Sequence, residues 1–113
     1  MKTCKLLREQ VAAATGSKKA QLVLKNAQIV NVFTQSVETG DIAIEGGYIV
    51  GIGNYEGITE KDLGGAYVCP GFLDGHIHIE SSMTSPGEFE RAVVPHGTIA
   101  VITDPHEIAN VAG

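Results

Sequence analysis

The chain has 113 residues, of which 43% are hydrophobic and 19% charged, and its formal net charge is -5. This composition is typical of one folded domain and excludes a disordered chain. The acidic balance argues against nucleic-acid binding, which needs a basic face. No apolar run approaches the roughly 20 residues that span a bilayer, and the N-terminus lacks a signal-peptide pattern. We therefore expect a cytoplasmic protein that binds neither nucleic acid nor membrane.

The two cysteines, Cys4 and Cys69, lie far apart and form no C-x-x-C pair. This spacing argues against a disulfide framework and against a cysteine-rich zinc site. Both are expected to be free thiols, with Cys69 buried in a strand.

The first 16 residues predict a short amphipathic helix between Thr3 and Thr15 that stops at Gly16. Four apolar residues recur in it at helical spacing. They are Leu6, Leu7, Val11 and Ala14.

From Gln21 to residue 69 apolar and polar residues alternate, which predicts short strands joined by turns. Gly46-Gly47 predicts a hairpin turn, because paired glycines tolerate the positive φ that tight hairpins need. These strands suggest a small sheet or half of a sandwich. Strand character is expected around Leu22 and Leu24 and over 29–33, 37–44 and 48–52.

Beyond Pro70 the pattern changes to apolar segments of strand length, at 72–79 and 98–103, which are typical of buried strands. Between them Ser85 and Pro86 predict the N-cap and first position of a helix, and a further helix is expected from Asp104. A strand–helix–strand–helix order is typical of the start of a parallel α/β domain. Two such strands cannot bury both faces alone, so we expect the sequence to stop inside a larger domain.

His76 and His78 lie two residues apart within the first of these predicted strands. Alternate side chains of a strand point the same way, so the two imidazoles can chelate one divalent metal, with Glu80 next in line. The alternative is a pair of polar residues capped by hydrogen bonds at a strand end. Asp74 on the same face could orient a metal ligand or bond the adjacent turn.

A second candidate group, Asp104-Pro105-His106-Glu107, directly follows the other predicted strand. Residues after strand carboxyl ends line the active-site face of strand–helix barrels, so His78 and Asp104 are expected on neighbouring loops. A helix start alone would explain Asp104 and Glu107. It does not explain His106, which stays a site candidate.

The motif P-G-F-L-D-G-H-I-H, running from Pro70 to His78, resembles the metal-dependent amidohydrolase superfamily. Two longer runs are more specific: D-G-H-I-H-I-E-S-S-M from Asp74 and D-P-H-E-I-A-N-V from Asp104. With these runs the chain is similar to the bacterial adenine deaminase family over nearly its whole length.

This resemblance implies an α/β fold in two parts. Residues 1–69 would form an N-terminal helix with a small β-sandwich, a composite domain. Residues 70–113 would form the first β-α-β units of an incomplete (β/α)8 TIM barrel. A homo-oligomer is expected.

The activity that the resemblance implies is hydrolytic deamination of adenine to hypoxanthine and ammonia in purine salvage. It also implies a divalent metal pair (Mn, Fe or Zn) that lowers the pKa of bound water and supplies hydroxide. The remaining metal ligands would lie beyond residue 113, so the chain alone is expected to be inactive.

The residues that match family motif positions fall into three groups. His76 and His78 match the metal-ligand pair. Ser81 and Ser82 are candidates for substrate contact. The candidates for catalysis are Glu80, Asp104, His106 and Glu107.

Two other functions stay open. One is another amidohydrolase that acts on cyclic amides, similar to dihydroorotases or hydantoinases. The other is a non-catalytic module that self-associates through exposed strands. The zinc-dependent base deaminases with H-x-E and P-C-x-x-C motifs are excluded, because the chain has no C-x-x-C.

Overall fold

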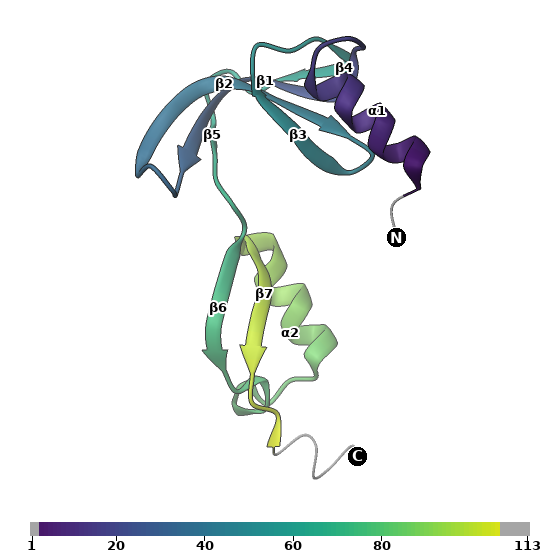
Figure 1. The fold of residues 1–113 in the computed structure, drawn as a ribbon. Helices are drawn as coiled ribbons and strands as arrows, with labels where there is room; N and C mark the ends of the chain where they lie inside the picture. The colour runs from purple at the N-terminus through teal and green to yellow at the C-terminus, as the bar shows by residue number, and fades with distance from the viewer. Residues whose placement is uncertain (1–2, 107–113) are drawn as a thin grey trace. The chain divides into compact units, whose positions relative to one another are not determined.

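The computed structural model describes residues 3–106. The chain divides into two compact units, Met1–Cys69 and Pro70–Gly113 (Figure 1). Each unit is described by itself. Among the described residues, every helix is too short or too polar to cross a membrane.

The first unit begins with helix α1, Cys4–Ala14, which confirms the predicted helix. Thr3 caps its N-terminus by accepting a hydrogen bond from the Leu6 N–H at 3.4 Å. The buried residues of α1 are Gln10 and Ala13 rather than the predicted apolar stripe, since Leu7 and Val11 are each 54% exposed. The small Ala13 lets the helix approach the sheet closely.

Five strands form one mixed sheet in the order β3-β2-β1-β4, with the short β5 also paired to β1. β2 runs antiparallel to both β1 and β3, whereas β4 and β5 run parallel to β1. The strands span Ala20–Asn31 (β1), Ser36–Glu45 (β2), Tyr48–Gly53 (β3), Gly57–Asp62 (β4) and Tyr67–Val68 (β5).

Most of the predicted strand pattern of this unit is confirmed. The hairpin turn between β2 and β3 has positive φ angles of 58° at Gly46 and 78° at Gly47. The two predicted segments around Leu22 and over 29–33 merge into the single strand β1, and Phe33 lies in the turn after it. The parallel neighbours of β1 were not predicted individually, because alternation along a strand carries no information about its partner.

A β-bulge interrupts the pairing of β1 with β2 between Leu24 and Ala27. Lys25 and Asn26 oppose the single residue Asp41, and Asn26 has a positive φ of 57°. The Asp41 carboxylate accepts hydrogen bonds from the Asn26 N–H at 3.1 Å and the Tyr55 N–H at 3.2 Å, and it pairs with the Lys25 ammonium. The Asp41 carboxylate thus provides a hydrogen-bond acceptor for the Asn26 amide at the bulge.

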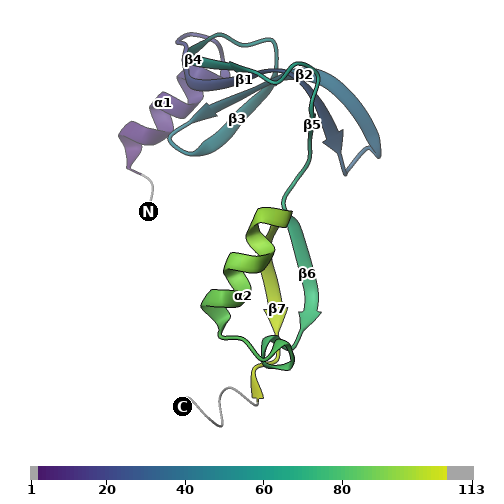
Figure 2. The ribbon, with the colours of Figure 1, turned by 180° about the vertical axis from the view of Figure 1, so that it is seen from behind.

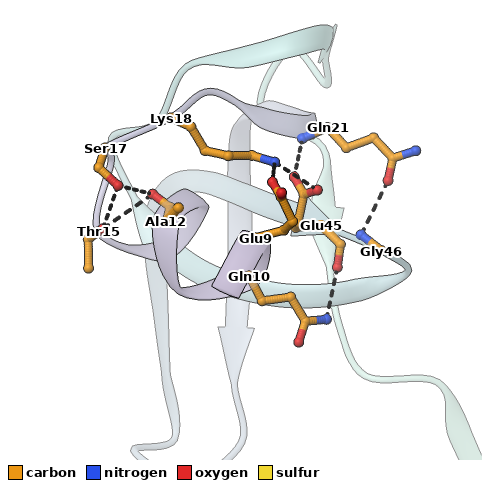
Figure 3. A network of polar contacts seen from close by, with 9 residues as sticks. All are labelled: Glu9, Gln10, Ala12, Thr15, Ser17, Lys18, Gln21, Glu45 and Gly46. Carbon is orange, nitrogen blue, oxygen red and sulfur yellow. Dashed lines mark hydrogen bonds and ion pairs between the residues drawn. The ribbon is translucent and has the colours of Figure 1, made fainter. Parts of the chain in front are cut away.

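Polar contacts fasten α1 to the sheet (Figure 3). The Lys18 ammonium lies 2.6 Å from the Glu9 carboxylate and 3.1 Å from that of Glu45. Glu45 also accepts from the Gln21 N–H at 2.9 Å, and its carbonyl accepts from the Gln10 amide at 3.2 Å. The helix and the β2–β3 hairpin therefore share one partly buried polar junction.

The second unit has two parallel strands, β6 (Phe72–Ile77) and β7 (Thr98–Thr103), with helix α2 (Pro86–Val93) packed on one face (Figure 2). The predicted strand–helix–strand order is confirmed. The Ser85 side chain accepts from the Glu88 N–H, as expected of the N-cap. Short 3-10 helices, η1 (Ile79–Ser82) and η2 (Val94–His96), flank α2.

We expected both strands to be buried, and for the described residues this prediction is wrong. Leu73 on β6 is 72% exposed, and Ile99 on β7 is 67% exposed. Apolar composition identified the strands, but burial needs a second layer on the face that α2 does not cover. β6 also ends at Ile77, short of the predicted residue 79.

The expectation for Cys69 is wrong as well. The residue is exposed and lies just after β5, so its side chain is not part of a strand interior. Cys4 is exposed too, and both are free thiols, as predicted.

Candidate metal centre

The carboxyl ends of β6 and β7 bring the two predicted groups of site residues to one place. Ile77, the last residue of β6, pairs with Thr103, the last residue of β7. The N–H of Asp104 then donates to the Ile77 carbonyl at 3.4 Å. The first residues after each strand, His78 and Asp104, are therefore neighbours, as the sequence predicted.

The imidazoles of His76 and His78 face each other across a short gap. Their Nε2 atoms are 3.2 Å apart, and the ring planes meet at 76° with centroids 5.0 Å apart. Two nitrogens that each lie about 2.0–2.1 Å from one tetrahedral ion are about 3.3 Å apart. The pair therefore fits a shared divalent cation, and without one it is joined by an N–H···N hydrogen bond.

His78 also belongs to a second group, with Asp104 and His106. One ligand atom from each of the three residues lies within 4.8 Å of the others. His106 Nδ1 is 3.4 Å from an Asp104 carboxylate oxygen, and its ring centroid is 5.2 Å from that of His78. His78 thus stands between the other two histidines. The Asp104 and His106 side chains are each more than half exposed, so a small ligand can reach them.

Glu80 reaches His78 by a route that the sequence did not predict. The strand ends before Glu80, so the residue does not follow the histidines along a strand face. Instead η1 turns the chain back, and Glu80 Oε1 lies 3.7 Å from His78 Nδ1. The Glu80 side chain is only 10% exposed. His78 therefore presents Nδ1 to a buried carboxylate and Nε2 to His76.

The two serines differ in what they can offer a ligand. The Ser82 hydroxyl donates to the Ile79 carbonyl and contacts Thr84 Oγ1 at 2.7 Å, so it closes the η1 turn. Ser81 is exposed, and its backbone N–H donates to the His78 carbonyl at 3.1 Å. Glu107, the remaining catalytic candidate, lies outside the described residues.

Comparisons with known proteins show what the chain resembles. Residues 67–113 match the amidohydrolase family. The chain is 60% identical over 96% of its length to "Adenine deaminase 2" of Carboxydothermus hydrogenoformans, of which it covers 19%. It is 60% identical over 95% of its length to the adenine deaminase of Geobacillus kaustophilus, and 51% identical over its whole length to that of Listeria monocytogenes. It covers 18% and 20% of these two proteins.

A solved structure also resembles the chain. The L-hydantoinase (dihydropyrimidinase) from Arthrobacter aurescens matches 76% of this chain and 21% of its own, with a TM-score of 0.59 and 21% sequence identity. At this identity the likeness shows a shared mixed α/β fold. The chain spans about a fifth of the length of the curated relatives that it matches. The chain is thus similar in sequence to adenine deaminases over nearly its whole length, and residues 67–113 are similar to the amidohydrolase family.

Proposed function

We propose that this chain is the N-terminal part of an adenine deaminase, which hydrolyses adenine to hypoxanthine and ammonia in purine salvage. The observation that carries the proposal is the identity of 50–60% to adenine deaminases over nearly the whole chain. The histidine pair supports it, because hydrolytic deamination needs an activated water and two imidazoles 3.2 Å apart fit a metal ion.

His76 and His78 are the residues that would hold this ion, through the facing Nε2 atoms. When bound, a divalent ion (Mn, Fe or Zn) lowers the pKa of a coordinated water and so supplies hydroxide near neutral pH. Glu80 would steady His78 from the other side of the ring, since its carboxylate lies 3.7 Å from Nδ1. A carboxylate behind a ligating histidine fixes the orientation of the ring.

Asp104 and His106 lie beside the pair and carry the proton-transfer roles in this proposal. Their side chains contact each other at 3.4 Å, so one can accept a proton while the other stabilises the charge. Glu107 is proposed as a further catalytic group from its motif position alone. Ser81 is the better placed of the two serines for contact with a purine, because the Ser82 hydroxyl is used within η1.

The proposal extends to the fold of the whole protein. Residues 1–69 would complete a small β-sandwich, of which the mixed sheet is one layer, and residues 70–113 would begin a (β/α)8 barrel. We further propose a metal pair completed by ligands from later strands, a homo-oligomer, and a cytoplasmic location.

A chimera tests the activity. This chain replaces the matching 107 residues of the Geobacillus kaustophilus adenine deaminase, which is 60% identical to it. The Mn-loaded chimera should release ammonia from adenine, and His76→Ala within it should lower the rate at least about a thousandfold. The isolated chain should release none.

The outcome against the proposal is a folded, metal-loaded chimera that does not deaminate adenine. Hydantoin and dihydropyrimidines serve as counter-substrates in the same assay. Turnover of these compounds in place of adenine would assign the chain to a cyclic-amide hydrolase instead.

A further inference from the structure

One of the register shifts between β6 and β7 is a β-bulge in β6 at the histidine pair. Asp74 pairs with Val101, and Ile77 pairs with Thr103, so β6 advances one residue more than β7 over this step. Gly75 and His76 therefore share a single position of the ladder. Bulges are uncommon between parallel strands, and next to active sites they re-aim side chains.

The bulge changes the reason for the facing histidines. In a regular strand, residues 76 and 78 would share a face by alternation alone. Here the strand contains an extra residue at Gly75–His76, so regular pairing with β7 does not by itself fix the direction of the His76 ring. Some other contact must fix His76 so that its Nε2 lies 3.2 Å from that of His78.

Asp74 makes that contact. Its Oδ1 accepts a hydrogen bond from the His76 backbone N–H at 3.1 Å. The side chain thus spans the bulge and gives the His76 amide an acceptor on its own strand. Without Asp74 this exposed amide would bond to water, and the backbone at His76 would lose the contact that constrains the direction of its imidazole.

The first unit of the chain offers a partial parallel, in which the aspartate lies on the partner strand. At the bulge in β1, an Asp41 carboxylate oxygen accepts from the Asn26 N–H at 3.1 Å. In both bulges an aspartate oxygen satisfies the amide of the extra residue. The two bulged residues differ in their roles. Asn26 has a structural role, whereas His76 is a candidate metal ligand.

We propose that Asp74 is a positioning residue for the metal centre, which fixes the bulged backbone of His76 and thereby aims its imidazole at His78. Asp74 acts through the peptide of His76 and does not touch the ion. What matters is a side-chain oxygen at the Oδ1 position, and the negative charge is secondary. This inference rests on the metal site of the proposed function, although its backbone part can be tested without a metal.

Zn²⁺ binding to the 113-residue chain, measured by competition with a chromogenic chelator, provides the test. Asp74→Ala removes the acceptor and should weaken Zn²⁺ binding by about 10–100-fold, as loss of an outer-shell partner commonly does. Asp74→Asn keeps an oxygen at the same place and should bind within about 3-fold of the unaltered chain. Glu90→Gln, an exposed change on α2, controls for lost charge.

The His76 amide gives a readout independent of metal. Its nitrogen–proton NMR signal should exchange slowly with solvent in the unaltered chain and in Asp74→Asn, and should exchange faster in Asp74→Ala. Equal binding by Asp74→Ala and the unaltered chain would overturn the inference. So would equally weak binding by the Asn and Ala variants, since charge would then be the cause.

Two further outcomes are distinguishable. If Asp74→Ala does not fold, the unaltered chain and Asp74→Asn decide, and a His76 amide that exchanges freely in either overturns the inference. If the unaltered chain and His76→Ala bind Zn²⁺ equally weakly, the metal proposal fails, while the amide measurement still decides the role of Asp74.

Discussion

Replacement of Asp41 by alanine should destabilise the first unit strongly, because this carboxylate holds the bulge of β1. The residue is 6% exposed and accepts from the Asn26 N–H, the Tyr55 N–H and the Lys25 ammonium. A backbone N–H left without an acceptor costs about 1–3 kcal/mol. Both amides are only partly buried, so the lower end applies, and the expected loss is about 2–3 kcal/mol in total.

Tyrosine fluorescence follows this unit selectively. All three tyrosines, Tyr48, Tyr55 and Tyr67, lie before residue 70, and the chain has no tryptophan. For a unit of this size, 1 kcal/mol shifts the melting temperature by about 4–8 °C, so Asp41→Ala should melt about 8–24 °C earlier. The exposed Glu60→Gln removes the same charge from β4 and should shift the melting temperature by less than about 4 °C.

The stability that Asp41 contributes should change with pH in a definite direction. Burial alone would raise the pKa of Asp41, but the Lys25 ammonium and the two N–H donors outweigh it and lower the pKa. A lowered carboxyl pKa contributes stability above about pH 4, and this contribution is lost as the pH falls through the folded-state pKa. Asp41 likewise raises the pKa of Lys25. The stability that the charged Lys25 contributes is therefore lost only above about pH 10.

The stability difference between the unaltered chain and Asp41→Ala should therefore be constant near neutral pH and shrink below about pH 4. The difference is the quantity to plot, because Glu9 and Asp62 also have lowered pKa values. A melting temperature lowered by less than about 4 °C would refute the reasoning. So would a difference that persists undiminished at pH 2.

Three further changes give shorter tests. Gly51→Ala places a Cβ 2.0 Å from the hydroxyl of Tyr55, which donates to the Ala14 carbonyl, and should cost about 1–3 kcal/mol in thermal unfolding; an unchanged melting temperature would contradict this packing. Val23→Ala leaves a cavity at a fully buried side chain and should lower the free energy of unfolding in urea by about 1–3 kcal/mol. A decrease of less than about 0.5 kcal/mol would contradict this expectation. His78→Ala should abolish Zn²⁺ binding by the chain, because His78 belongs to both ligand groups; retained binding would place the ion elsewhere.

Local chemistry made much of the secondary structure predictable. The helix between Thr3 and Thr15, the Ser85 N-cap and the Gly46-Gly47 hairpin each depend on local sequence, and all three were found where the sequence placed them. The burial of β6 and β7 was not predictable in the same way. Burial depends on what covers a surface. An apolar strand has the same sequence whether or not a second layer of structure covers it.

The candidate site was predicted as a set of residues but not as a geometry. The histidine spacing and the positions of Asp104 and His106 after a strand indicated which side chains would gather. The bulge at Gly75–His76 and the turn that returns Glu80 to His78 were missed. The bulge depends on register against β7, and a single sequence does not state the register.

The mixed sheet also determines the order in which the first unit can fold. β2 and β3 each follow their partner through a short turn, so the antiparallel ribbon of β1, β2 and β3 can form from local contacts. The parallel partners of β1 lie about 40 residues further along the chain, and such distant pairings form slowly. Until Tyr67 and Val68 have been synthesised, one edge of the central strand stays open to other chains. The rate of translation through β4 and β5 therefore sets how long the nascent protein is exposed to aggregation.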